Sequence, residues 1–125
     1  MRVKQQVAEE VRRQHDILAT WLGTDCDADV LDRFRAAHDD AFTMVTTEGA
    51  VLGLGELFAA LEGARNAQPG LVIDVDRIEI VTSAGNLTVV RFTETHRVDG
   101  RVTERVVTAV LRDLRWLHVH ETSVP

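Results

Sequence analysis

The fold is decided by residues 87–122, which read LTVVRFTETHRVDGRVTERVVTAVLRDLRWLHVHET. Apolar and polar residues alternate in three segments of this stretch, 87–98, 101–113 and 115–122. A period of two residues is typical of strands that bury one face. Asp99-Gly100, between the first two segments, has the chemistry of a hairpin turn. The stretch therefore predicts three consecutive strands in one antiparallel sheet.

The residues before this stretch predict three helices, a short strand and one more long strand. Apolar residues recur at helical spacing in 3–21, in a second segment that ends near His38, and in 54–64, and β-branched and aromatic residues mark strands at 41–47 and 71–81. Helices followed by strands predict an α+β fold, with the three helices packed on one face of a curved antiparallel sheet. Such a sheet leaves a cavity at its open end, or a second face for a partner to cover.

Length and composition narrow the class of protein. A chain of 125 residues suits one domain, spanning 1–125. The net charge of -6 argues against nucleic acid as a partner, because phosphate binding needs a concentrated positive surface. No segment has the pattern of a signal peptide or a membrane span. The single cysteine, Cys26, excludes an internal disulfide and fits a reducing compartment, so a cytoplasmic location is expected.

The order of elements and four short motifs resemble the nuclear transport factor 2-like superfamily, whose members have a cone-shaped, cystatin-like α+β fold. The motifs are Phe42–Gly49 (FTMVTTEG), Val89–Phe92 (VVRF), Asp99-Gly100 and Trp116–His120 (WLHVH). Within the superfamily the chain looks most like SnoaL-like proteins of unknown function and the association domain of calcium/calmodulin-dependent kinase. The resemblance implies a pocket between the concave face of the sheet and the helices, and a homodimer formed through the sheet.

Strand alternation sorts the polar residues onto two faces of the sheet. The resemblance assigns one face to the pocket, and the ligand-binding residues expected there are Arg91, Thr93, Arg105, Met44 and Thr46. We expect the other face to form the dimer interface, with its histidine and glutamate side chains hydrogen-bonded across the two-fold axis. Its expected interface residues are Glu94, His96, Trp116, His118 and His120.

The arginines indicate what the pocket would hold. Arg91 takes the position of one pocket arginine of the association domain, whereas Val107 and Ser123 take the positions of two others. A guanidinium is a planar donor fork that suits carboxylates, so a small organic or anionic ligand is expected. The alternative is a structural ion pair between an arginine of this face and Glu121.

His38 and Glu121 are the candidate catalytic residues, each as a general base. The alternative for His38 is a buried histidine with one hydrogen bond, on the apolar face of the second helix. His15 is expected to be exposed at the edge of the first helix. The chain has no tyrosine, so the chemistry that the resemblance to ketosteroid isomerases implies is not expected in its usual form.

Three functions remain open from the sequence. The first is a small-molecule-binding protein, the second a cyclase-type lyase or isomerase that acts on a small organic substrate, and the third a homodimeric assembly module with an inert pocket. A metal site at His96, His118 and His120 is weighed against the dimer interface and is not favoured, because the spacing of these histidines is loose. No cofactor is expected.

Overall fold

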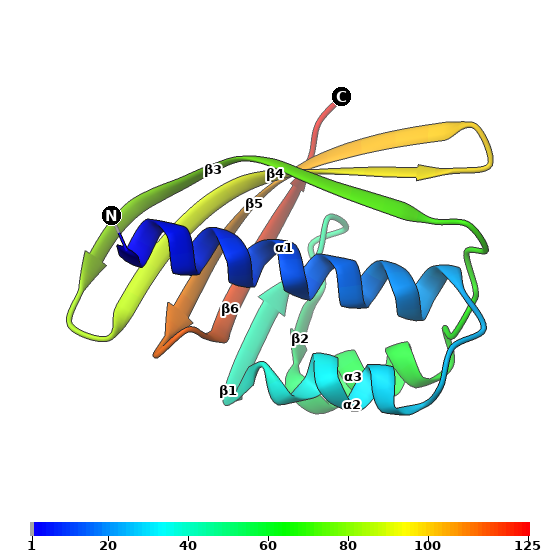
Figure 1. Ribbon diagram of the computed structural model, residues 1–125, viewed down its shortest axis with the longest axis horizontal. Coiled ribbons are helices and arrows are strands. Elements are labelled where there is room, and N and C mark those ends of the chain that lie inside the picture. The colour runs from blue at the N-terminus through cyan, green and yellow to red at the C-terminus, as the bar shows by residue number, and fades with distance from the viewer. Residues whose placement is uncertain (1) are drawn as a thin grey trace.

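The computed structural model in Figure 1 describes residues 2–125 and contains three helices and six strands. The elements in chain order are α1 (Arg2–Gly23), α2 (Asp29–Ala36), β1 (His38–Val45), β2 (Val51–Gly53), α3 (Leu54–Glu62), β3 (Val72–Ala84), β4 (Leu87–Val98), β5 (Arg101–Arg112) and β6 (Arg115–Ser123). The six strands form one curved sheet, and the helices pack on one side of it. The expected α+β class, with three helices on a curved sheet, is confirmed.

The sheet is mixed, and this differs from the expected antiparallel arrangement. Its strand order is β2-β1-β6-β5-β4-β3, and β1 pairs with β6 in parallel while every other pair is antiparallel. The alternation of apolar and polar residues reports which face of a strand is buried, but it carries no information about strand direction. β1 and β6 are far apart in the sequence and are not joined by a hairpin turn, so the sequence contains no sign of their relative direction.

Two tight turns fix the register of the last three strands. Asp99 and Gly100 have φ values of 50° and 74°, and Val98 pairs with Arg101. Positive φ at both central residues gives the turn a backbone twist that matches the twist of the flanking strands. The turn between β5 and β6, at Asp113-Leu114, also has two positive φ values, 52° and 63°. The hairpins expected in 87–122 are therefore present.

The hydrophobic core consists of two clusters, one between the helices and the concave face of the sheet and one among the helices. Val7 and Val11 of α1 are fully buried and belong to a cluster with Phe92, Val107 and Trp116 of the sheet. The second cluster lies among the helices and contains Ile17, Trp21, Val30, Leu31, Phe34, Phe58 and Leu61. In Figure 1, α1 runs along the sheet while α2 and α3 lie together at one end of it. The space between these layers is where the candidate site lies.

The end of α1 is held by the segment that leads into β3. Three carbonyl groups in the last turn, those of Trp21, Leu22 and Gly23, accept hydrogen bonds of 2.9 Å from the backbone of residues 66, 68 and 70. A side chain at Gly23 would bring its Cβ to 3.0 Å from the Leu71 nitrogen, so this close approach requires glycine. The contact places residues 66–71 beside the helix layer.

His38 does not lie on the second helix as expected. α2 ends at Ala36, and His38 begins β1. Its side chain nevertheless returns to the helix, because Nδ1 lies 2.9 Å from the Phe34 carbonyl oxygen. The expected burial of His38 is therefore present, but the residue reaches its site from a strand.

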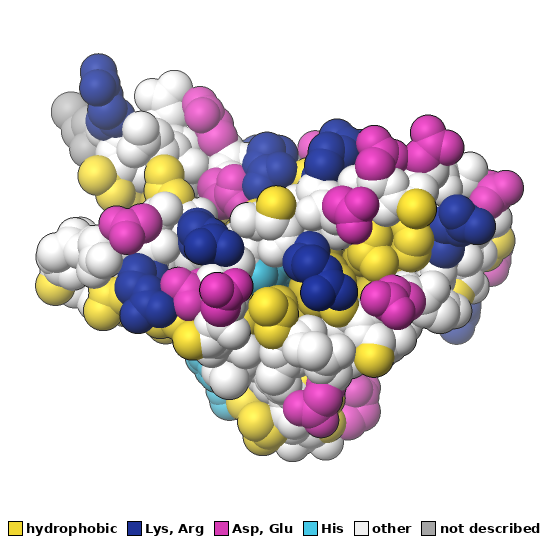
Figure 2. Space-filling model, turned by 90° about the horizontal axis from the view of Figure 1, so that it is seen from below, with side chains coloured by type: hydrophobic (Ala, Val, Ile, Leu, Met, Phe, Trp, Pro, Cys, Tyr) yellow, Lys and Arg dark blue, Asp and Glu magenta, His cyan; other side chains and the backbone are white. Residues whose placement is uncertain are grey.

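Figure 2 shows one face of the molecule, on which basic and acidic side chains are interspersed with hydrophobic ones. This face presents no concentrated positive surface of the kind that a phosphate backbone requires. Within residues 2–125, none of the helices combines the length and the apolar character that crossing a membrane would take.

Candidate functional site

A cavity of about 420 Å³ lies between the concave face of the sheet and the helices. Most of its wall is apolar, with Leu18 and Leu57 from the helices and Phe42, Phe92 and Trp116 from the sheet. Exposed lining residues mark its mouth: Gln68, Arg101 and Thr103. Buried polar residues line its other end and one of its walls: Gln14, His15, His38 and Glu94.

The sequence assigned the side chains of β4 to the wrong faces of the sheet. Phe92, Glu94 and His96 line the cavity, whereas Arg91 is exposed on the other side and pairs with Glu79 at 3.5 Å. The two-residue turn explains this placement. It makes Phe92 pair with Val107 across the ladder, and directly paired residues point to the same face of a sheet. Arg91 is thus removed from the cavity by the register of the hairpin.

The other expected ligand-binding residues divide between two locations. Met44 and Arg105 line the cavity. Thr93 points away from it, on the same side of β4 as Arg91. Thr46 lies in the turn between β1 and β2, where its Oγ1 accepts a hydrogen bond of 3.1 Å from the Ala50 nitrogen. The expected placement of Thr93 and Thr46 in the pocket is therefore wrong.

The residues expected at the dimer interface are divided between the cavity and the outer face of the sheet. Glu94, His96 and Trp116 line the cavity, so their expected place on the outer face is wrong, whereas His118 and His120 stay outside it. The register of β5 and β6 shifts between Val110 and Leu111. Trp116 therefore pairs with Leu111 and His118 with Val110. The two-residue turn at Asp113-Leu114 thus places Trp116 on the concave face with Leu111, and the extra residue that follows it in β6 keeps His118 and His120 on the outer face.

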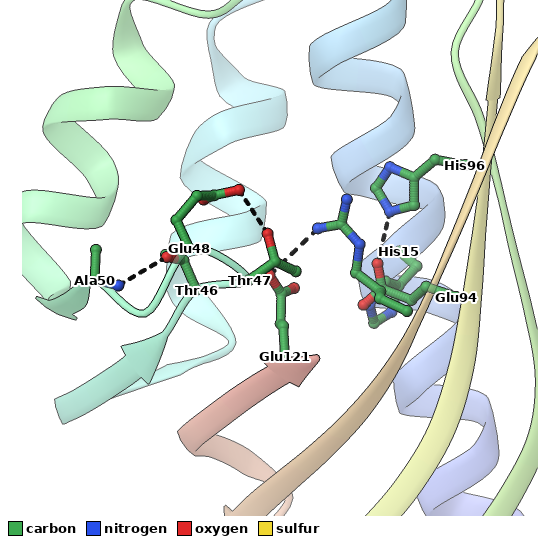
Figure 3. A network of polar contacts seen from close by, with 9 residues as sticks. His15, Thr46, Thr47, Glu48, Ala50, Glu94, His96 and Glu121 are labelled. Carbon is green, nitrogen blue, oxygen red and sulfur yellow. Dashed lines mark hydrogen bonds and ion pairs between the residues drawn. The ribbon is translucent and has the colours of Figure 1, made fainter. Parts of the chain in front are cut away.

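A buried carboxylate, Glu94, lies between two histidines at the wall of the cavity (Figure 3). Its Oε2 is 2.8 Å from His15 Nε2, and its Oε1 is 2.8 Å from His96 Nε2. His15 Nδ1 lies 2.7 Å from the carbonyl oxygen of Val11. A carbonyl and a carboxylate can only accept hydrogen bonds, so both nitrogens of His15 carry protons. His15 is the cation of a buried ion pair.

Each charge of this pair stabilises the ionised form of the other and so offsets the cost of burial. Burial alone would lower the pKa of His15, but the charge and hydrogen bond of Glu94 outweigh it and raise that pKa above 6.5. Burial would likewise raise the pKa of Glu94, but His15 and His96 outweigh it and hold that pKa well below its usual range. Each group is ionised because the other is present.

The expected exposure of His15 is wrong, since the residue is 7% exposed. The sequence held the signal, because His15 follows Val7 and Val11 at steps of four residues and so shares their buried stripe. Gln14, which is 3% exposed and also lines the cavity, was missed by the sequence analysis. It lies on the same stripe, three residues after Val11 and four before Leu18, so helical spacing could have identified it.

Glu121 and Arg105 line the same cavity as Glu94, and Figure 3 shows Glu121 on β6. Arg105 Nη1 donates to Glu121 Oε1 at 3.3 Å, so the alternative of an arginine paired with Glu121 is realised by Arg105. Burial raises the pKa of Glu121, and the charge of Glu94 raises it further, while Arg105 opposes both effects. Glu121 thus keeps its proton to higher pH than an ordinary glutamate does.

His38 lies at the buried end of the cavity among aromatic rings. Its ring meets those of Phe34, Phe42 and Phe58 edge to face, with centroid distances of 4.9, 4.6 and 5.4 Å. Burial lowers the pKa of His38 to about 4, although the Phe34 carbonyl partly opposes the effect. His38 is therefore neutral near pH 7. Across residues 2–125, no three His, Cys, Asp or Glu side chains are grouped so as to hold a metal ion.

Comparisons with known proteins identify the fold of this chain. Neither protein-family models nor curated proteins gave a match to this chain. Among solved structures, an NTF2-like protein of unknown function from Pseudomonas aeruginosa is 28% identical, with 96% of this chain and 99% of that chain covered and a TM-score of 0.90. The chain has the nuclear transport factor 2-like fold, and the expected resemblance to that superfamily is confirmed.

More distant structures share the fold alone. A CamKII hub homology domain from Chlamydomonas reinhardtii is 17% identical over 95% of this chain and 98% of that chain, with a TM-score of 0.68. An LEH-like epoxide hydrolase from Mycobacterium tuberculosis is 14% identical over 96% of this chain and 84% of that chain, with a TM-score of 0.57. The same architecture thus occurs in an enzyme and in a hub domain, so function has to be argued from the site.

Proposed function

We propose that the protein binds a small organic molecule with an apolar body and a polar end in the cavity between sheet and helices. The observation that carries this proposal is the division of the cavity wall. Rings and aliphatic side chains form most of it, while Glu121 and Arg105 face the cavity together from neighbouring strands. A volume of about 420 Å³ lies within the range of roughly 300–1,000 Å³ typical of ligand sites.

Filling the cavity tests this proposal. Val119 lines the cavity on β6, and Val119→Trp is expected to weaken binding of two aromatic probes, 2-naphthol and 4-phenylphenol, by about tenfold, because the larger side chain occupies their space. Binding would be measured by calorimetry and by NMR shifts of the lining residues. The matched control is Val106→Trp on the outer face, where Val106 is exposed. Equal affinity in wild type and Val119→Trp, or no binding by wild type, contradicts the proposal.

Acid–base catalysis is a second candidate, favoured by the raised pKa of Glu121 inside the cavity. Its carboxylate would take a proton from a carbon next to a carbonyl group. The C–H electron pair would form a carbon–carbon double bond while the carbonyl π pair moves onto oxygen, where the Arg105 guanidinium would stabilise the enolate. Return of the proton to another carbon would give an isomer, and loss of a β-substituent would give a lyase reaction. His38 suits this role less, since a pKa of about 4 makes it a weak base.

Proton exchange separates catalysis from binding alone. With 2-tetralone as the probe in D₂O, a catalytic Glu121 would speed deuterium incorporation next to the carbonyl above the rate in buffer. Glu121→Gln would return it to that rate while the ketone still binds. Acceleration that survives in Glu121→Gln would exclude this residue as the base. Binding without any acceleration would leave the protein as a binder of small molecules.

The homodimer and the cytoplasmic location also remain proposals. The outer face of the sheet supports the first, because it carries exposed Val102 and Val106 and, further along the sheet, His118 and His120. Native mass spectrometry of the untagged protein reports the subunit number and any bound molecule in one measurement. A dimer without a ligand would favour the assembly module with an inert pocket, and a monomer would contradict the interface.

A further inference from the structure

A buried amide at the inner end of the cavity has an oxygen without a partner. Gln14 of α1 lines the cavity and is 3% exposed. Its Nε2 donates to the carbonyl oxygen of Phe34 at 3.1 Å. A carbonyl cannot donate, so this bond fixes which end of the amide faces Phe34. The Oε1 atom is thereby turned away, and no group among residues 2–125 donates a hydrogen bond to it.

His38 supplies a second acceptor beside the first. Its Nδ1 lies 2.9 Å from the same Phe34 oxygen, so Nδ1 carries the proton. In a neutral imidazole the other nitrogen is then a bare acceptor. No protein group within the described chain bonds to His38 Nε2, whereas His38 itself lines the cavity. One backbone oxygen thus orients two unpaired acceptors at the same end of the cavity.

The neighbouring hydrogen-bond donors already have protein acceptors. Trp116 Nε1 donates to Glu10 Oε2 at 2.9 Å, and Arg115 donates to the backbone oxygen of His38. Both N–H groups of His15 donate hydrogen bonds, one to Val11 and one to Glu94. Leaving a buried acceptor unpaired is costly, so native proteins seldom do so without a reason. A group brought by a ligand is the donor that this end of the cavity lacks.

We infer that the ligand carries a neutral hydrogen-bond donor, a hydroxyl group on an aromatic or alicyclic body, which enters first and bonds to Gln14 Oε1 or His38 Nε2. This inference rests on the proposed function and adds the chemical class and orientation of the ligand. A carboxylate is excluded at this end, because two acceptors would face its charge in an apolar surrounding. The rings of Phe34, Phe42 and Trp116 suit the flat body of such a molecule.

Paired probes test the inference. Wild type is expected to bind 2-naphthol and 4-phenylphenol about tenfold more tightly than their methyl ethers, which keep the ring but lose the donor. His38→Asn retains an N–H for the Phe34 oxygen and removes the Nε2 acceptor, and Gln14→Met removes Oε1. Each variant is expected to reduce the preference for the hydroxyl group, and the double variant to bring the ratio of phenol affinity to ether affinity to about twofold or less.

Matched controls and a direct readout keep the test decisive. Gln5→Met and His118→Asn change the same residue types outside the cavity and should keep the tenfold preference. If a variant fails to fold, the ¹⁵N shift of His38 Nε2 in wild type should still move with 2-naphthol and stay constant with its ether. A preference that persists in the double variant overturns the inference, and so does a 2-naphthol complex in which neither the His38 Nε2 shift nor the Gln14 side-chain amide shift moves.

The two proposals fail in distinguishable ways. If phenols and ethers bind equally well to wild type, and Val119→Trp weakens both, the cavity binds small molecules but its inner end does not select a donor. If none of the four probes binds to wild type, the proposed function fails, and this inference fails with it.

Discussion

Glu94→Leu is expected to lower the free energy of unfolding by about 3–5 kcal/mol, because it leaves the buried His15 cation without its counter-charge. His15 and Glu94 are 7% and 3% exposed, so water cannot replace the lost partner. His96 loses its acceptor in the same substitution. Urea unfolding near pH 6 provides the measurement. The control Glu104→Leu removes an exposed carboxylate from β5 and should stay within about 0.5 kcal/mol of wild type.

The histidine itself gives a second readout of this prediction. In Glu94→Leu the pKa of His15 should fall below 6.5, because burial is its largest influence and Glu94 is what reverses it. NMR titration of the histidine ring nitrogens would show the change. His15→Leu combined with Glu94→Leu should recover much of the loss, since no unpaired charge then remains. A loss below about 1 kcal/mol in the single variant would show that the pair contributes little.

The second large effect is a loss of stability in acid that depends on His38. Its pKa is lowered from 6.5 to about 4 in the folded protein. A lowered pKa means that the folded state resists protonation, so the stability from neutral His38 is present above pH 6.5 and is lost as pH falls through 4. Between about pH 7.5 and pH 4 the expected loss from this residue is about 3 kcal/mol.

Comparison with His38→Asn isolates this contribution. Other groups titrate in the same range with different signs. The raised pKa of Glu121 adds stability as pH falls, the raised pKa of His15 removes stability as pH rises above 6.5, and the lowered pKa of Glu94 removes stability below 4.5. These contributions are common to both proteins. Stability profiles that run parallel from pH 7.5 to pH 4, measured by urea unfolding, would rule out the His38 effect.

The sequence predicted the fold well because its strongest patterns are local. The alternation in 87–122 and the Asp99-Gly100 turn specify three paired strands without reference to the rest of the chain. The parallel pairing of β1 with β6 could not be predicted in this way, since neither strand carries a mark of its distant neighbour. Long-range pairing follows from packing of the whole sheet, which no local pattern encodes.

The candidate site was predicted less well, for two different reasons. The face of Arg91 was an avoidable error, because a two-residue turn already determines that Phe92 and Val107 share a face. The face of Trp116 was avoidable for the same reason, because the turn at Asp113-Leu114 pairs it with Leu111, whereas the irregularity that follows Trp116 and keeps His118 outside the cavity has no signature in the sequence. Met44, Arg105, Glu121 and His38 do line the cavity, whereas the partner of Glu94 had to be found in the structure.

The Phe34 carbonyl has a consequence for redesign of the cavity. It is a main-chain atom, so every amino acid at position 34 supplies it, and it orients both Gln14 and His38. The Phe34 side chain, in contrast, forms part of the wall. The side chain at position 34 therefore determines the shape of this end of the cavity, whereas the main chain determines the direction of its two acceptors. Smaller or larger residues at position 34 would change which molecules fit while the two acceptors keep their direction, so the protein can acquire new ligand shapes without losing its preference for a donor.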